Sequence, residues 1–129
     1  MLPKKNVSML AGVPLRGGAD LRYTDTVAFP KLLKDAGYTT SMVGKWHAGN
    51  PDARDPALFD RYFGFLSGMT DSFAGGPDWW ENDKPFKAFP ADFYTTKAFT
   101  DRAIEWLGER ADDPTPHFLY VSHNAPHHP

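Results

Sequence analysis

The sequence predicts an α/β fold with a mostly parallel sheet, and three observations support this class. First, a helix-like stretch followed by a strand-like stretch occurs twice, with a proline-rich and glycine-rich excursion between the two units. Second, hydrophobic residues make up 41% of the 129 residues and charged residues 23%, which is a globular balance. Third, helices that alternate with strands are typical of parallel sheets. We therefore expect one core of domain size with long loops.

The first regular elements lie in the amino-terminal third of the chain. A short helix is expected from Asn6 to Leu10. Thr26 is the expected cap of a helix over Val27 to Ala36, which Gly37 ends. Its apolar residues recur with helical spacing and predict one core-facing stripe. They are Phe29, Leu32, Leu33 and Ala36. The β-rich stretch Tyr38 to Val43 follows directly and predicts a strand.

An excursion from Asn50 to Asp92 carries many prolines, glycines and aromatic residues without a sustained period. A short helical turn is expected near Pro56 to Arg61. Aromatic side chains are expected to pack the excursion on the body of the fold, as a satellite core rather than a base-stacking platform. They are Phe59, Tyr62, Phe63, Phe65, Trp79 and Trp80.

The second helix and the second strand close the predicted order. Thr95 or Thr96 caps a helix that runs to about Arg110. Four apolar residues of this helix form one buried stripe. They are Phe99, Ala103, Trp106 and Leu107. The apolar run Phe118 to Val121 predicts a central strand covered on both faces.

Composition excludes several functional classes. The net charge of −2 gives no broad basic surface for nucleic acid or an anionic membrane. The chain has no cysteine, so disulfides, thiolate metal sites and cysteine nucleophiles are absent. No apolar run is long enough to span a membrane or to form a signal peptide. We therefore expect a soluble chain, as given, whose compartment the sequence leaves open.

Lysine and histidine side chains follow the two predicted strands. Lys45 and His47 come after the first strand, and His127 comes shortly after the second. Ligands of parallel sheets bind beyond the carboxyl ends of the strands, so the three side chains could converge. A lysine suits one oxygen of a tetrahedral anion, and a histidine can donate to another oxygen or move a proton. An oxyanion site is one interpretation; a surface lysine beside a packed histidine is the alternative.

Two metal sites are weaker interpretations. His123 and His127 have the i, i+4 spacing of a zinc site on a helix. Pro126 disfavours a helix there, and no glutamate lies between the histidines as a metalloprotease base would require. Five aspartates follow the first strand, but they lack the regular alternation and the glycine of a calcium-binding EF-hand loop, so we expect them to form turns. They are Asp52, Asp55, Asp60, Asp71 and Asp78.

The stretch Gly37 to His47, which ends in Gly-Lys-Trp-His, resembles a signature of the type I sulfatases, the formylglycine-dependent arylsulfatases. Further blocks similar to this family occur in the expected order across the chain. They are Ser8 to Gly12, Phe59 to Gly68, Tyr94 to Ala103 and Phe118 to Pro129. The resemblance implies part of an alkaline-phosphatase-like α/β/α sandwich, incomplete, that hydrolyses sulfate esters. It covers residues 1–129 as a partial catalytic domain.

The resemblance also implies roles for individual residues. Lys45 would contact the sulfate, and His47 would hydrogen-bond the nucleophile or help its turnover. His127 would contact the sulfate or protonate the leaving oxygen. The substrate would be a small-molecule or carbohydrate sulfate ester. Full-length relatives use Ca²⁺ and are often periplasmic or secreted.

The sequence departs from the family pattern where the nucleophile is expected. The family places a Cys or Ser, converted to formylglycine, in a CxPSR-type motif, but this chain reads Leu2-Pro3-Lys4-Lys5-Asn6 there. The family's metal-binding segments lie upstream and downstream of the matching residues. We therefore expect a sulfatase fragment that is inactive and marginally stable alone. Two alternatives stay open, a non-catalytic sulfate- or phosphate-binding relative and a phosphate or phosphonate ester hydrolase of the same superfamily.

Overall fold

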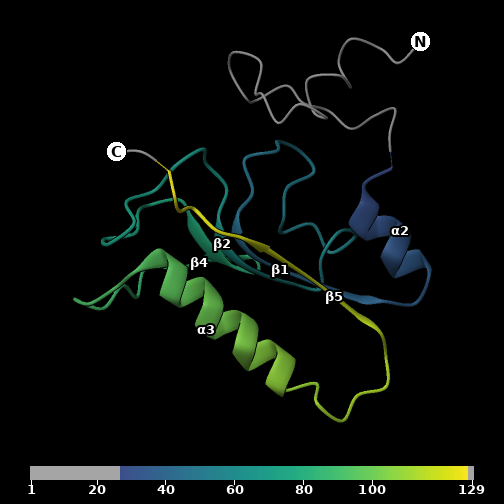
Figure 1. Ribbon diagram of the computed structural model, residues 1–129. Helices are drawn as coiled ribbons and strands as arrows, with labels where there is room; N and C mark the ends of the chain where they lie inside the picture. Colours follow the sequence, from purple (N-terminus) through teal and green to yellow (C-terminus); the bar gives the residue numbers. More distant parts are fainter. Residues whose placement is uncertain (1–26, 128–129) are drawn as a thin grey trace.

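The computed structural model describes residues 27–127, and they form a mixed five-stranded sheet with two helices (Figure 1). The strand order is β4-β3-β2-β1-β5. Strand β1 pairs in parallel with β2 and β5, whereas β3 pairs antiparallel with both β2 and β4. The strands are β1 (Thr39–Lys45), β2 (Arg61–Phe65), β3 (Trp79–Glu81), β4 (Lys84–Pro85) and β5 (His117–Ser122). The predicted α/β class is confirmed. The helix expected at Asn6 to Leu10 lies outside the described residues.

The helices α2 (Phe29–Asp35) and α3 (Thr95–Gly108) lie on opposite faces of the sheet (Figure 1). Phe99 and Trp106 of α3 pack in one core cluster, with Val43 of β1. The other face carries a second cluster, to which Ala28 before α2 contributes. The arrangement is therefore three layers, α/β/α. Neither helix is long and apolar enough to cross a membrane.

Strand β1 lies between β2 and β5 and is hydrogen-bonded to both. Its residues from Thr40 to Gly44 are all buried, and alternate side chains enter different clusters, Met42 on the α2 side and Val43 on the α3 side. The strand extends two residues beyond the predicted Tyr38 to Val43, because hydrogen bonds to β2 and β5 continue along both of its edges. Lys45 is therefore the last residue of the strand.

The prediction that Phe118 to Val121 forms a central strand covered on both faces is wrong for the described residues. Strand β5 lies at an edge of the described sheet, and Tyr120 and Val121 are 44% and 38% exposed. A continuous apolar run indicates burial but does not tell whether the neighbour on each side is present. The strand that is buried on both faces is β1, whose sequence is more polar.

The strands of the excursion were not predicted. Aromatic β-formers make up most of β2, which pairs in parallel with β1 and continues the sheet. The expected helical turn near Pro56 to Arg61 is a hydrogen-bonded turn from Asp55 to Phe59, and Arg61 already belongs to β2. The expected satellite packing of the aromatic residues is confirmed, and Trp79 lies at its centre. Its ring is within 6 Å of Phe63, Phe65, Phe93 and Phe99.

Both helices differ from the prediction in how they are capped and in which residues they bury. Thr26, the predicted cap, lies outside the described residues, and α2 is preceded by Ala28 without a side-chain cap. The apolar stripe of α2 is not buried; Phe29 and Leu32 are exposed. Helix α3 is preceded by Tyr94 without a side-chain cap, so the predicted cap at Thr95 or Thr96 is wrong. Three residues of its predicted stripe are buried, but Leu107 is 51% exposed.

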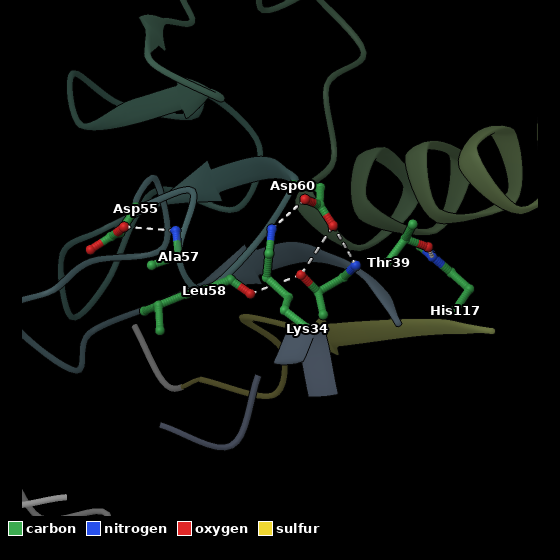
Figure 2. Close-up of polar contacts among 8 residues, drawn as sticks. Lys34, Thr39, Asp55, Ala57, Leu58, Asp60 and His117 are labelled. Carbon is green, nitrogen blue, oxygen red and sulfur yellow. Dashed lines mark hydrogen bonds and ion pairs between the residues drawn. The ribbon is translucent and has the colours of Figure 1, made fainter. Parts of the chain in front are cut away.

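A polar network holds the amino end of β1 (Figure 2). Asp60 accepts a hydrogen bond from the buried backbone N–H of Thr40, 2.8 Å away, and pairs with Lys34 of α2. The Thr40 hydroxyl donates to the Leu58 carbonyl at 2.8 Å. Burial opposes ionisation of Asp60, but the bonds from Lys34 and Thr40 outweigh it and lower the pKa of Asp60. Since the folded pKa lies below the unfolded value, this contribution to stability is present at neutral pH and is lost as the pH falls through the folded pKa.

We predict that Asp60→Ala lowers the free energy of unfolding by about 1–3 kcal/mol, because it leaves the buried Thr40 N–H without an acceptor. The control is Asp35→Ala, which removes only the exposed i, i+4 pair with Lys31 and should cost about 0.5 kcal/mol or less. Urea unfolding at neutral pH measures both. Equal losses for the two variants would contradict this role of Asp60.

Candidate anion-binding site

The carboxyl ends of β1, β2 and β5 meet at two glycines. Gly44 of β1 lies in register with Gly64 of β2 and with Ser122 of β5. A Cβ on Gly44 would lie 1.9 Å from the Ser122 carbonyl oxygen, and one on Gly64 would lie 2.0 Å from the Gly44 oxygen. Gly44 also has φ +113°, which side-chain-bearing residues rarely adopt. The three strands therefore end at one edge, next to Lys45.

Lys45 ends β1 as a half-buried residue, and within residues 27–127 none of the ion pairs involves it. Trp46, the next residue, packs in the α2-side cluster, with its ring edge-on to Phe59 and its indole N–H 2.8 Å from the Gly49 carbonyl. The indole thus holds the chain in place just beyond the strand.

His47 lies one residue further on, in an unusual backbone conformation. Its φ is +45°, so the alternation of an extended strand no longer fixes the direction of its side chain. Its backbone N–H donates to the Leu66 carbonyl at 3.1 Å. The imidazole lies against the backbone of Gly68, where a Cβ would be 2.8 Å from His47 Cε1 and 2.9 Å from Nε2. Burial and the nearby Lys45 charge lower the pKa of His47.

His127 comes from the neighbouring strand. Because β1 and β5 are parallel neighbours with Gly44 opposite Ser122, the turn after β5 begins at the same edge of the sheet. Asn124 in this turn is buried, and its side-chain amide donates to the Ser72 hydroxyl at 3.1 Å and the Thr70 carbonyl at 3.4 Å. The Asn124 carbonyl accepts the backbone N–H of His127 at 3.0 Å. His127 itself is exposed.

The other histidines do not join this edge as a metal site. His117 begins β5 at the opposite end of the sheet, where its Nδ1 is 2.8 Å from the Thr39 hydroxyl (Figure 2). His123 is exposed, and its ring lies 6.3 Å from that of Phe99. Residues 27–127 contain no group of three His, Asp or Glu that could hold a metal ion.

The prediction of turn-forming aspartates is confirmed for Asp52, Asp55 and Asp71, while Asp60 and Asp78 make other contacts. Asp55 and Asp71 accept backbone N–H groups two or three residues on, which is the usual role of aspartate in a turn. Asp52 pairs with Arg54, and Asp78 accepts the indole N–H of Trp80. Asp60 belongs to the network at the amino end of β1.

Two residues at this edge were not singled out from the sequence. Gly68 contacts the His47 ring, and Asn124 holds the turn that leads to His127. The sequence does not indicate which side chain lies beside Gly68. Asn124 occurs in a polar stretch, where the sequence alone suggests a solvent-exposed residue. Neither could be found without the path of the loop between β2 and β3.

Comparisons with known proteins show similarity over most of the chain. A family model described as Sulfatase matches residues 2–129. Mouse arylsulfatase J is 36% identical over 121 residues, which is 81% of this chain and 19% of that protein. The N-acetylglucosamine-6-O-sulfatase of Bacteroides thetaiotaomicron is 38% identical over 104 residues, 80% of this chain and 17% of that protein.

A solved structure is also similar. It is a complex of a protein with its substrate D-glucosamine-2-N,6-O-disulfate, with a TM-score of 0.65, 34% identity, and coverage of 93% of this chain and 22% of that one. The chain thus spans about a fifth of the length of these relatives. The segment expected to carry a nucleophile motif, Leu2 to Asn6, lies outside the described residues. Its match over nearly all of its length makes this chain a member of the sulfatase family.

Proposed function

We propose that this chain is the part of a sulfuric ester hydrolase that binds and positions the sulfate group, within a larger catalytic domain. The observation that carries the proposal is Lys45 at the carboxyl edge of β1, outside every ion pair of the described residues and followed by His47. His127 follows the neighbouring parallel strand. Fixed donors around a tetrahedral anion are what sulfate-ester cleavage requires, because charge builds on the leaving oxygen.

Each side chain has a distinct proposed role. Lys45 supplies the positive charge for one sulfate oxygen. Burial and Lys45 together favour neutral His47 at neutral pH, so its ring acts as a hydrogen-bond donor or a proton acceptor rather than a second cation. His127, which is exposed, contacts the sulfate or gives a proton to the leaving oxygen. The nucleophile and the calcium ligands belong to parts outside residues 27–127.

The proposed substrate is a sulfate ester of a carbohydrate. Two similar proteins support this class, since one is an N-acetylglucosamine-6-O-sulfatase and the other was solved with a sulfated glucosamine. An aryl sulfate ester is the convenient probe, because its leaving group is coloured and its sulfate makes the same demands on the donors. Calcium is proposed for the complete enzyme, held by residues beyond the described ones.

We predict that Lys45→Ala in the full-length protein carrying this segment lowers the rate of aryl sulfate hydrolysis by about 10²–10³-fold, the usual cost of removing one donor to a developing oxyanion. The control is Lys97→Ala, because Lys97 is on the exposed face of α3 in a pair with Asp101. Sulfate release measures both variants. An unchanged rate for Lys45→Ala, or faster release of phosphate from the matching aryl phosphate, would overturn the proposed function.

The 129-residue chain alone is predicted to release no sulfate from an aryl sulfate, with or without calcium. The sequence Leu2 to Asn6 has no Cys or Ser where the family's nucleophile is expected, and we propose that the calcium ligands lie outside residues 27–127. Covalent and metal catalysis each contribute many orders of magnitude to the rate. Turnover above background by the isolated chain, abolished by Lys45→Ala, would show that this segment is catalytically sufficient and would refute the prediction.

The titration of His47 tests its environment directly. We predict a midpoint below the ordinary value of 6.5, and Lys45→Gln should raise it, because removing a nearby positive charge favours the imidazolium form. The midpoint in this variant should still lie below 6.5, since burial makes the larger contribution to the lowered pKa of His47. The His47 ring proton shift in NMR gives the midpoint, and Lys97→Gln is the matched control. No change with Lys45→Gln would place the ammonium away from the ring.

A further inference from the structure

The loop 67–76 between β2 and β3 contacts both halves of the candidate site. Gly68 lies against the His47 ring, which follows β1. Thr70 and Ser72 accept hydrogen bonds from the side chain of Asn124, which follows β5. We propose that this loop is the positioning element of the sulfate site, with Gly68 and Asn124 as positioning residues for His47 and His127. The inference rests on the proposed function only for the purpose that the two histidines serve.

The contact between Gly68 and His47 explains why residue 68 is a glycine. The nitrogens and Cε1 of the imidazole occupy the space of a side chain, since a Cβ would be 2.8–3.2 Å from these three atoms. Gly68 is not among the described glycines with positive φ, so its backbone does not itself require glycine. A side chain at position 68 would therefore have to displace the ring of His47.

The loop is anchored firmly enough to act as a template. The indole N–H of fully buried Trp79 donates to the Thr70 hydroxyl at 2.8 Å. The Ser72 carbonyl accepts the backbone N–H of Thr95, at the start of α3, at 2.9 Å. Asp71 accepts the N–H groups of the turn at Phe73 and Ala74. Core, helix and turn thus all fix the same loop.

The second contact of the loop reaches the β5 side. Asn124 is 7% exposed, and both hydrogen bonds of its amide nitrogen go to the loop. The backbone carbonyl of Asn124 accepts a hydrogen bond from the backbone N–H of His127. A shift of the loop would therefore move both the backbone that contacts the His47 ring and the start of the turn that leads to His127. Sulfate oxygens are only about 2–3 Å apart, and misplacing a catalytic group by about 1 Å can cost about 10²-fold in rate.

The test compares Gly68→Ala with Gly108→Ala in the 129-residue chain. Gly108 ends α3, and a Cβ there meets nothing within 4 Å, so it is a matched control for adding one methyl group. The first readout is the nuclear Overhauser effect between the His47 Cε1 proton and the Gly68 Cα protons. The second is the His47 titration midpoint, which a merely destabilised fold would not move. Neither readout uses sulfate.

Wild type and Gly108→Ala should show the Overhauser contact and the same His47 midpoint. Gly68→Ala should lose the contact and raise the midpoint toward the ordinary value, because the displaced ring gains solvent. In the full-length protein, Gly68→Ala should lower kcat for an aryl sulfate about 10²-fold with little change in KM. An absent contact in wild type, or a wild-type midpoint or kcat in Gly68→Ala, would overturn the inference.

Asn124→Asp keeps the size of the side chain but turns the donor facing the Thr70 carbonyl into an acceptor. It should move the His127 ring signals and leave those of His47 unchanged, and the opposite pattern would count against the loop as a shared template. This variant also decides the case in which Gly68→Ala does not fold. If Lys45→Ala proves neutral for hydrolysis while these signals behave as expected, the proposed function fails and the positioning role stands.

Discussion

The hydrogen bonding of β1 along both of its edges is the constraint on which the rest of the structure depends. Parallel pairing with β2 on one side and β5 on the other buries the strand from Thr40 to Gly44 and brings three carboxyl ends to one line. The three strands can approach this closely only because Gly44 and Gly64 have no side chains. Lys45 is the last residue of β1 at this edge.

The two ends of β1 serve different purposes. At the amino end, Asp60 satisfies the Thr40 N–H and Thr39 contacts His117, so the polar groups there bind one another (Figure 2). At the carboxyl end, Lys45 has no carboxylate partner among the described residues. The ring of His47 contacts Gly68, and its pKa is lowered. Polar groups that satisfy each other stabilise a fold, whereas polar groups that face outward unpaired are suited to bind a ligand.

The sequence predicted the elements with strong local signals and missed those set by neighbours. Helix α3 follows from periodicity, β1 from its β-rich residues and β5 from its apolar run. The candidates Lys45, His47 and His127 follow from their place after strands. Strand β2 was hidden in a proline-rich excursion because a short aromatic run fits strand and loop equally well until a partner is known. Exposure of β5 and the roles of Gly68 and Asn124 depend on contacts across the sheet, which no local pattern encodes.

Lys45, His47 and His127 are proposed to surround one tetrahedral anion. A crystal structure of the full-length protein with bound sulfate tests it most directly. We predict sulfate oxygens within hydrogen-bonding distance of the Lys45 ammonium and of both imidazole rings, with the His47 ring in contact with Gly68. A sulfate bound elsewhere, or a His127 ring turned away from the anion that Lys45 holds, would contradict it.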